Sequence, residues 1–130
     1  MRKILALALL LPLPAFGQDA LTAGDFEAYA TGKTLSYALA GEIYGAEQYL
    51  PNRRVRWAFK DDTCRDGYWY EAEGLICFVY EHDATPQCWS FYLEDGSLLA
   101  RYAGDAEGSE LSEVAQTPVP LICAGPDLGV

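Results

Sequence analysis

The sequence contains a single histidine, His82, and this scarcity limits the chemistry that the chain can perform. Catalysis by a serine or cysteine nucleophile with a histidine base requires a histidine within hydrogen-bond reach. His82 follows Glu81 in a polar segment, and we interpret it as a solvated loop residue. The cysteines also lack the paired short spacings of a zinc site. We therefore expect no catalytic residues, no metal and no cofactor.

Basic residues are also scarce, with nine lysines and arginines against 19 aspartates and glutamates. Only seven of the nine follow residue 17, whereas all the acidic residues do, so residues 18–130 carry a net charge of −12. Nucleic acids and anionic lipids bind through lysine and arginine, so we expect neither as a partner. A cationic protein or a component of the cell envelope is the electrostatically natural partner, although such a charge also serves solubility.

No apolar run is long enough to cross a membrane as a mature helix. The longest, ILALALLLPLPAF, is short and is interrupted by Pro12 and Pro14. Arg2 and Lys3 precede it and Ala15-Phe16-Gly17 follow it, which is the pattern of a secretory signal peptide. We predict that residues 1–17 are removed near Gly17 and that a single domain, residues 18–130, is periplasmic or secreted without a membrane span.

Four cysteines are present, and in an exported domain of this size they predict two disulfides. Cys77 and Cys88 can lie directly opposite each other across one hairpin, a distance that a disulfide spans. If Tyr70 pairs with Leu75, Cys64 lies roughly 13 Å from Cys77 along the strand. This leaves Cys64 to pair with Cys123. The alternative, Cys64 with Cys77 and Cys88 with Cys123, stays open.

The periodicity of the chain predicts an all-β fold with one short N-terminal helix. Residues 18–32 form the helix, with Thr22 as its N-cap and Gly32 at its end. Apolar residues then alternate with polar ones, and the predicted strands are 34–40, 41–50, 53–59, 63–71, 75–81, 87–94, 98–102 and, as a short eighth strand, 110–116. Tight turns predict an antiparallel up-and-down meander of seven or eight strands, closed into a small barrel or a half-barrel. Residues 33–103 form the sheet core, and 104–130 form a polar loop and a tethered tail.

The register decides which side chains face the core. A two-residue turn at Pro51-Asn52 places Glu47 opposite Arg56 on the outside, where Glu47 neutralises part of the basic cluster Arg53, Arg54 and Arg56. The same register places Tyr44 and Ala46 with Trp57 and Phe59 in the core. The other inward residues are Trp69, Ile76, Phe78, Tyr80, Trp89, Phe91, Leu93, Leu98, Ala100 and Tyr102. If bulky side chains fill the barrel, small-molecule transport is disfavoured, and a hollow barrel would favour it.

The opposite face of the later strands carries the candidate binding residues, which are Tyr68, Tyr70, Tyr92, Asp66 and Arg101. Tyrosines on this face suit a half-wet interface with a ligand or partner. Alternatively, cross-strand tyrosines stabilise the sheet and shield the disulfides. Asp66, Glu71 and Glu73 flank the aromatic run Tyr68-Trp69-Tyr70, and Asp66 with Glu71 or Glu73 is a candidate carboxylate pair for sugar cleavage. We prefer to interpret these residues as turn acids.

The segments GKTLSY, EQYLPNRRVRWAF, CRDGYWY, ICFVYE and CWSFYLEDG resemble small exported bacterial proteins of a domain-of-unknown-function family. The likeness covers residues 25–103 and implies a periplasmic or secreted β domain with no characterised activity. The outline also resembles periplasmic lysozyme inhibitors in fold alone, without their binding motif. We predict a non-catalytic binding or interaction module of the cell envelope, with an inhibitor of a cationic cell-wall hydrolase or a small carboxylate-dependent hydrolase as alternatives.

Overall fold

The computed structural model describes residues 19–60, 63–105, 107 and 109–123, so the predicted signal peptide lies outside the described residues. One helix is followed by eight strands and a short 3₁₀ turn, η1. Their bounds are α1 Ala23–Ala30, β1 Thr34–Leu39, β2 Glu42–Leu50, η1 Pro51–Arg53, β3 Arg54–Phe59, β4 Arg65–Ala72, β5 Leu75–Tyr80, β6 Asp83–Glu94, β7 Ser97–Tyr102 and β8 Glu110–Thr117. Within this described part, no helix is long and apolar enough to span a membrane.

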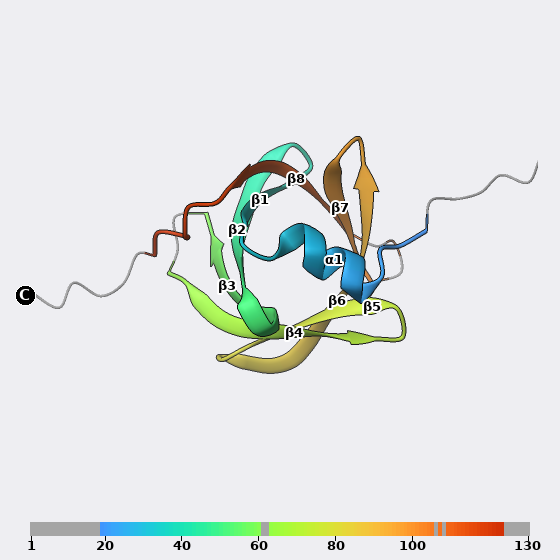
Figure 1. The fold of residues 1–130 in the computed structure, drawn as a ribbon, viewed down its shortest axis with the longest axis horizontal. Coiled ribbons are helices and arrows are strands. Elements are labelled where there is room, and N and C mark those ends of the chain that lie inside the picture. The colour runs from blue at the N-terminus through green and yellow to red at the C-terminus, as the bar shows by residue number, and fades with distance from the viewer. Residues whose placement is uncertain (1–18, 61–62, 106, 108, 124–130) are drawn as a thin grey trace, which may run out of the picture.

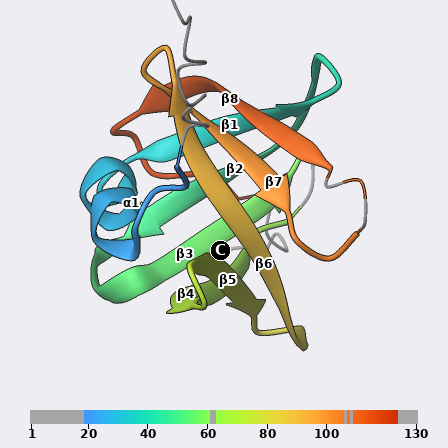
Figure 2. The ribbon, with the colours of Figure 1, turned by 90° about the vertical axis from the view of Figure 1, so that its right-hand side faces the viewer.

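The eight strands form a closed antiparallel barrel. Each strand pairs with the next one in the sequence, and β8 returns to pair with β1, where Thr34 lies opposite Thr117. The prediction of an up-and-down barrel is confirmed, and the closed form replaces the half-barrel. Because β8 lies between β7 and β1, the sheet extends beyond residue 103. Figure 1 looks down the barrel and shows α1 lying across one opening, and Figure 2 shows the barrel from the side with α1 at its left edge.

Helix α1 closes this end of the barrel with Phe26, which is fully buried. The Phe26 ring meets Tyr49 and Trp69 edge to face, at centroid distances of 5.6 and 5.2 Å. Thr22 caps the helix as predicted, since its hydroxyl accepts a hydrogen bond from the backbone N–H of Asp25. The short N-terminal helix therefore acts as the plug of the barrel.

Three hairpins use two-residue turns in which both residues have positive φ, which matches the twist of antiparallel strands. They are Ala40-Gly41, Glu73-Gly74 and Asp95-Gly96. The expected four-residue turn before Leu75 is therefore wrong, and Tyr70 pairs with Cys77 instead of Leu75. The slip is two residues, so the predicted faces of β4 and β5 are retained.

The predicted register between β2 and β3 is wrong by one residue. The connection is the three-residue η1, in which both Asn52 and Arg53 have positive φ, so Leu50 pairs with Arg54. A shift of one residue exchanges the two faces of a strand. Glu47 therefore lies opposite Trp57 inside the barrel and does not face Arg56 on the outside. Ala46 pairs with Ala58 on the outer face.

The connection between β5 and β6 is also shorter than expected. The loop predicted at 82–86 belongs mostly to β6, which begins at Asp83 opposite Tyr80. A bulge between Phe78 and Tyr80 absorbs the change in register. His82 is left at the hairpin turn and is exposed to solvent.

Both predicted disulfides are present. Cys77 and Cys88 are directly opposite on β5 and β6 with 3.9 Å between their α carbons, and Cys64 and Cys123 are 5.2 Å apart. The alternative connectivity is excluded. The second bridge ties the C-terminal tail to the barrel, where the Leu121 N–H also donates to the Gln48 side chain over 3.2 Å. Two disulfides are typical of a protein from an oxidising, non-cytoplasmic compartment.

Candidate functional site

The interior of the barrel is not completely filled. A cavity of about 80 Å³ lies on the far side of the core from α1. Since a buried water needs on the order of 10–15 Å³, the cavity has room for several waters or one small molecule. Four of the bulky residues predicted to face the core line this cavity: Trp57, Phe78, Trp89 and Phe91.

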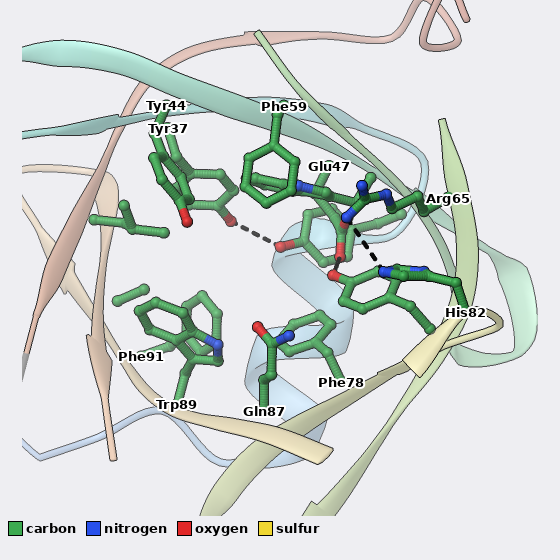
Figure 3. A pocket seen from close by; sticks show the side chains of 15 residues that line it. Tyr37, Tyr44, Glu47, Phe59, Arg65, Phe78, His82, Gln87, Trp89 and Phe91 are labelled. Carbon is green, nitrogen blue, oxygen red and sulfur yellow. Dashed lines mark hydrogen bonds between the residues drawn. The ribbon is translucent and has the colours of Figure 1, made fainter. Parts of the chain in front are cut away.

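The walls of the cavity are mostly aromatic. Tyr44, Trp57 and Phe59 form one corner, in which Phe59 stands edge to face with the other two rings at centroid distances of 5.4 Å. Figure 3 shows this corner facing Trp89 and Phe91 across the cavity. Ala100 occupies an inward position opposite Phe91, where its small side chain leaves space.

Glu47 is the buried carboxyl group of this cavity. Its side chain lines the cavity, and the residue is only 2% exposed. Oε1 accepts a hydrogen bond from the Tyr80 hydroxyl at 2.7 Å, whereas Oε2 has no hydrogen-bond partner among the described residues. Burial raises the pKa of Glu47 to about 8, although the hydrogen bond from Tyr80 lowers it. Near neutral pH this carboxyl group is therefore largely protonated.

The tyrosine hydroxyls near Glu47 form a neutral polar network. The hydroxyls of Tyr37 and Tyr49 are hydrogen-bonded to each other at 2.8 Å, and both residues are buried. Burial raises the pKa of Tyr37, of Tyr49 and of Tyr80 well above the ordinary value for tyrosine. These groups therefore supply hydrogen bonds without supplying charge.

The second buried glutamate, Glu113, has a different environment. Its carboxylate accepts hydrogen bonds from the Tyr29 hydroxyl at 2.7 Å, from the Leu98 N–H at 3.2 Å and from the Gln116 amide at 3.3 Å. Burial, followed by the Glu113 hydrogen bond and charge, raises the pKa of Tyr29 to about 12. Glu113 is thus satisfied by the protein and attaches α1 to β7 and β8. Glu47 is satisfied only in part.

Arg65 brings a positive charge to the lining of the cavity. The Arg65 Nη1 donates to His82 Nε2 at 3.2 Å, and the guanidinium lies 5.3 Å from the centroid of the Phe59 ring. The His82 ring lies beside Tyr80, with centroids 6.3 Å apart. His82 is exposed, as expected of a solvated residue, but it belongs to the rim of the cavity.

The five residues predicted for the outer face fall into separate groups. Tyr68, which is 52% exposed, lies beside Tyr70 with ring centroids 6.4 Å apart. Tyr92 lies under the Arg101 guanidinium on β6 and β7, and among the described residues it makes no ring contact with Tyr68 or Tyr70. Asp66 pairs with Arg56 at 2.7 Å.

The surface charges of the later strands are likewise paired locally. Arg101 contacts Glu110 at 2.6 Å, and Arg53 of the basic cluster contacts Glu27 of α1 at 3.0 Å. Asp66, instead of Glu47, neutralises Arg56. No lining residue of the cavity comes from the five outer candidates.

The three carboxylates considered for hydrolysis do not share a cleft in the described structure. Asp66 lies near the start of β4, whereas Glu71 lies near its end, roughly 17 Å along the strand. Glu71 accepts a hydrogen bond from the Gly74 N–H at 2.9 Å, and Glu73 is a residue of the same turn. Their geometry is that of turn and ion-pair residues.

Glu47 was missed as a site residue because the wrong β2–β3 register placed it outside. The signal that would have found it is the three-residue connection, which requires a left-handed conformation at both Asn52 and Arg53. Asparagine adopts this conformation readily, but arginine carries no such preference. Gly45, two residues earlier, also marks the inward face, since a side chain there would collide with the Trp57 ring.

No protein-family model matches the chain, and no curated protein or solved structure matches it either. The structural class of the protein is therefore defined by its fold and its candidate site alone. The chain is a small disulfide-linked β-barrel, plugged by a helix at one end, with an aromatic cavity and a buried carboxyl group inside.

Proposed function

We propose that the chain is an exported, non-catalytic binding module that holds a small molecule inside its barrel. The observation that carries the proposal is the cavity into which Glu47 points a carboxyl oxygen without a partner. Buried polar atoms in folded proteins are nearly always hydrogen-bonded, and an unsatisfied one costs about 1–3 kcal/mol. A bound molecule that forms a hydrogen bond with Oε2 would remove this cost.

Binding without catalysis fits the composition of the cavity. Its 15 lining residues include no serine, threonine or cysteine that a base could activate. The proposal of export rests on the N-terminal sequence pattern and on the two disulfides. The resemblance to small exported bacterial proteins is consistent with it.

The test is a screen of small neutral, cationic and anionic fragments by saturation-transfer NMR, with two variants for comparison. Ala100→Leu places a larger side chain in the cavity, and Tyr68→Ala removes the most exposed of the outer tyrosines. We expect fragments that bind the wild type and Tyr68→Ala but not Ala100→Leu. If no fragment distinguishes the wild type from Ala100→Leu, the cavity is not a binding site.

A second variant keeps this test meaningful if Ala100→Leu does not fold. Leu111→Phe also enlarges a side chain that lines the cavity. Leu111 lies on β8, directly opposite Ala100 of β7. Dispersed amide signals in a ¹H–¹⁵N spectrum establish the fold of each variant. Loss of fragment binding in folded Leu111→Phe would show, as for Ala100→Leu, that the fragments bind inside the cavity.

A second candidate function is inhibition of a cationic cell-wall hydrolase through the outer surface. The exposed Tyr68 beside Tyr70 and the net charge of −12 for residues 18–130 favour it. Affinity capture from envelope extract, with wild type and with Tyr68, Tyr70 and Tyr92 all changed to alanine, tests this idea. Equal recovery of every partner would exclude the tyrosines as the contact surface.

A further inference from the structure

We infer that the ligand of the cavity is a small amine, bound as a cation with an N–H group donating to Oε2 of Glu47. This inference rests on the proposed function and names the chemical class of its ligand. It combines three independent features of the cavity: the partnerless oxygen, the aromatic walls and the distribution of charge.

The first feature is the hydrogen-bonding state of Glu47. Oε1 already accepts from Tyr80, so the ligand must satisfy Oε2. A neutral donor such as an alcohol would supply a hydrogen bond only. An ammonium group also supplies the positive charge that an ionised, 2% exposed carboxylate needs, and charge-assisted hydrogen bonds are about twice as strong as neutral ones.

The second feature is the set of aromatic rings that line the same cavity as this carboxyl group. The faces of aromatic rings are electronegative and attract cations that lie within about 6 Å. Tyr44 and Trp57 have ring centroids 5.8 Å apart, and Phe59 closes the corner between them. Trp57 is also the cross-strand neighbour of Glu47, so carboxylate and rings act on the same small volume.

The third feature is the distribution of charge. The chain has a net charge of −10, which attracts cations from solution. Arg65 lines the same cavity, and its guanidinium contacts His82 and Phe59. An anion inside the cavity would meet the Glu47 carboxyl group and the aromatic rings as well as Arg65.

Binding of an amine must be linked to pH, because the pKa of the empty Glu47 carboxyl is raised to about 8. Below this value the incoming cation displaces a proton, so affinity rises by up to about tenfold per pH unit and levels off above pH 8. Other groups facing Glu47 are Tyr37 from β1, Tyr49 from β2, Arg65 from β4, Tyr80 from β5 and His82 from the β5–β6 turn. Burial raises the pKa of the three tyrosines well above this range, and the variant His82→Gln tests the histidine separately.

Isothermal titration calorimetry with three matched probes, n-butylamine, n-butanol and butyrate, tests the inference. We expect n-butylamine to bind most tightly to the wild type, with affinity rising between pH 6 and 8. Glu47→Gln should weaken n-butylamine by roughly 10- to 100-fold, remove the pH slope and leave n-butanol nearly unchanged. Glu73→Gln, which removes the same charge from an exposed turn, should behave like the wild type.

The outcomes separate this inference from the proposed function. If n-butylamine and n-butanol bind the wild type equally and both lose binding in Ala100→Leu, the cavity is a binding site but the inferred preference for an amine is wrong. Tighter binding of butyrate would also overturn it and assign an anion. If none of the three probes binds and Ala100→Leu matches the wild type, the proposed function fails as well. A pH dependence of n-butylamine affinity that survives Glu47→Gln but not His82→Gln would contradict the role of Glu47. If Glu47→Gln does not fold, the pH dependence of this affinity in the wild type still tests the inference.

Discussion

At the scale of single residues, the barrel interior presents the same side chain in two settings. Glu113 accepts hydrogen bonds from Tyr29, Leu98 and Gln116, so the protein itself compensates for its burial. Glu47 receives one hydrogen bond, from Tyr80. A buried carboxyl group with incomplete compensation avoids its charge by holding a proton, which makes Glu47 the proton-sensitive residue of the interior.

Glu47→Gln should change how stability depends on pH. The folded pKa is about 8 against an ordinary value of 4.5, so between these values the folded state binds more protons than the unfolded state. Stability from this group is therefore present below pH 4.5 and is lost as pH rises towards 8, by at most about 1.4 kcal/mol per unit. Urea denaturation from pH 5 to 8 should show Glu47→Gln gaining stability relative to wild type. A constant difference would contradict the raised pKa.

Tyr80→Phe should move the same transition to higher pH. The hydrogen bond from the Tyr80 hydroxyl favours the ionised form of Glu47, so its removal should raise the pKa above about 8. The ¹³C chemical shift of the Glu47 carboxyl carbon, followed by NMR titration, measures this directly. Tyr92→Phe on the outer face is the control and should leave the titration where it is. An unchanged or lower pKa in Tyr80→Phe would show that Tyr80 does not act on Glu47.

At the scale of secondary-structure elements, α1 is held by side chains at both ends of its packing face. Phe26 enters the core, and Tyr29 reaches Glu113 and the carbonyl of Gly96 in the β6–β7 turn. Glu27 adds an ion pair with Arg53 of η1. The helix thus connects the two halves of the barrel rim, in addition to filling its opening.

Tyr29→Phe should loosen this plug. The substitution removes a hydroxyl that donates to both oxygens of Glu113, at 2.7 and 3.0 Å, and leaves a buried carboxylate with fewer donors. We expect a loss of about 1–3 kcal/mol in the free energy of unfolding, measured with urea. Tyr92→Phe removes a hydroxyl from the outer face and should cost less than about 0.5 kcal/mol. Similar small effects for both would mean that Glu113 does not anchor α1.

The elements themselves were largely predictable from the sequence, because their signals are local. Asp95-Gly96 predicts a hairpin, and Thr22 predicts a helix start, through the conformations these residues favour. The β2–β3 register was not predictable in the same way, since it depends on Arg53 adopting a left-handed conformation that its residue type does not favour. That one residue moved Glu47 and Tyr49 from the outer face to the interior, and with them the candidate site.

At the scale of the whole molecule, barrel closure was predictable but the cavity was not. A meander of eight strands with tight turns closes because open edges are unfavourable. Whether the closed interior is full depends on how Trp57, Trp89 and Phe91 pack around small residues such as Ala100. Such packing is a property of the assembled set of side chains and leaves no periodic pattern in the sequence. The disulfide pairing, by contrast, followed from strand geometry.

Replacing Cys64 and Cys123 with serine should test how the tail is held. The bridge joins residues 59 apart, and the chain-entropy account gives about 4 kcal/mol for a loop of this length. The tail also makes hydrogen bonds through the Val119 carbonyl and the Leu121 N–H. Urea denaturation of the double variant should show a loss near the expected value. A loss below about 1 kcal/mol would mean that these contacts alone hold the tail.

The barrel closes only when β8, its last strand, pairs with β1. A chain is made, and passes through any export channel, from its N-terminus, so Thr34–Leu39 is ready long before Glu110–Thr117. Until the last strand arrives, two strand edges and the aromatic interior are open to water, which invites proteolysis and edge-to-edge association. A chain that stops short of Glu110 would lack the strand that pairs with both β7 and β1, so both of these strands would keep an exposed edge.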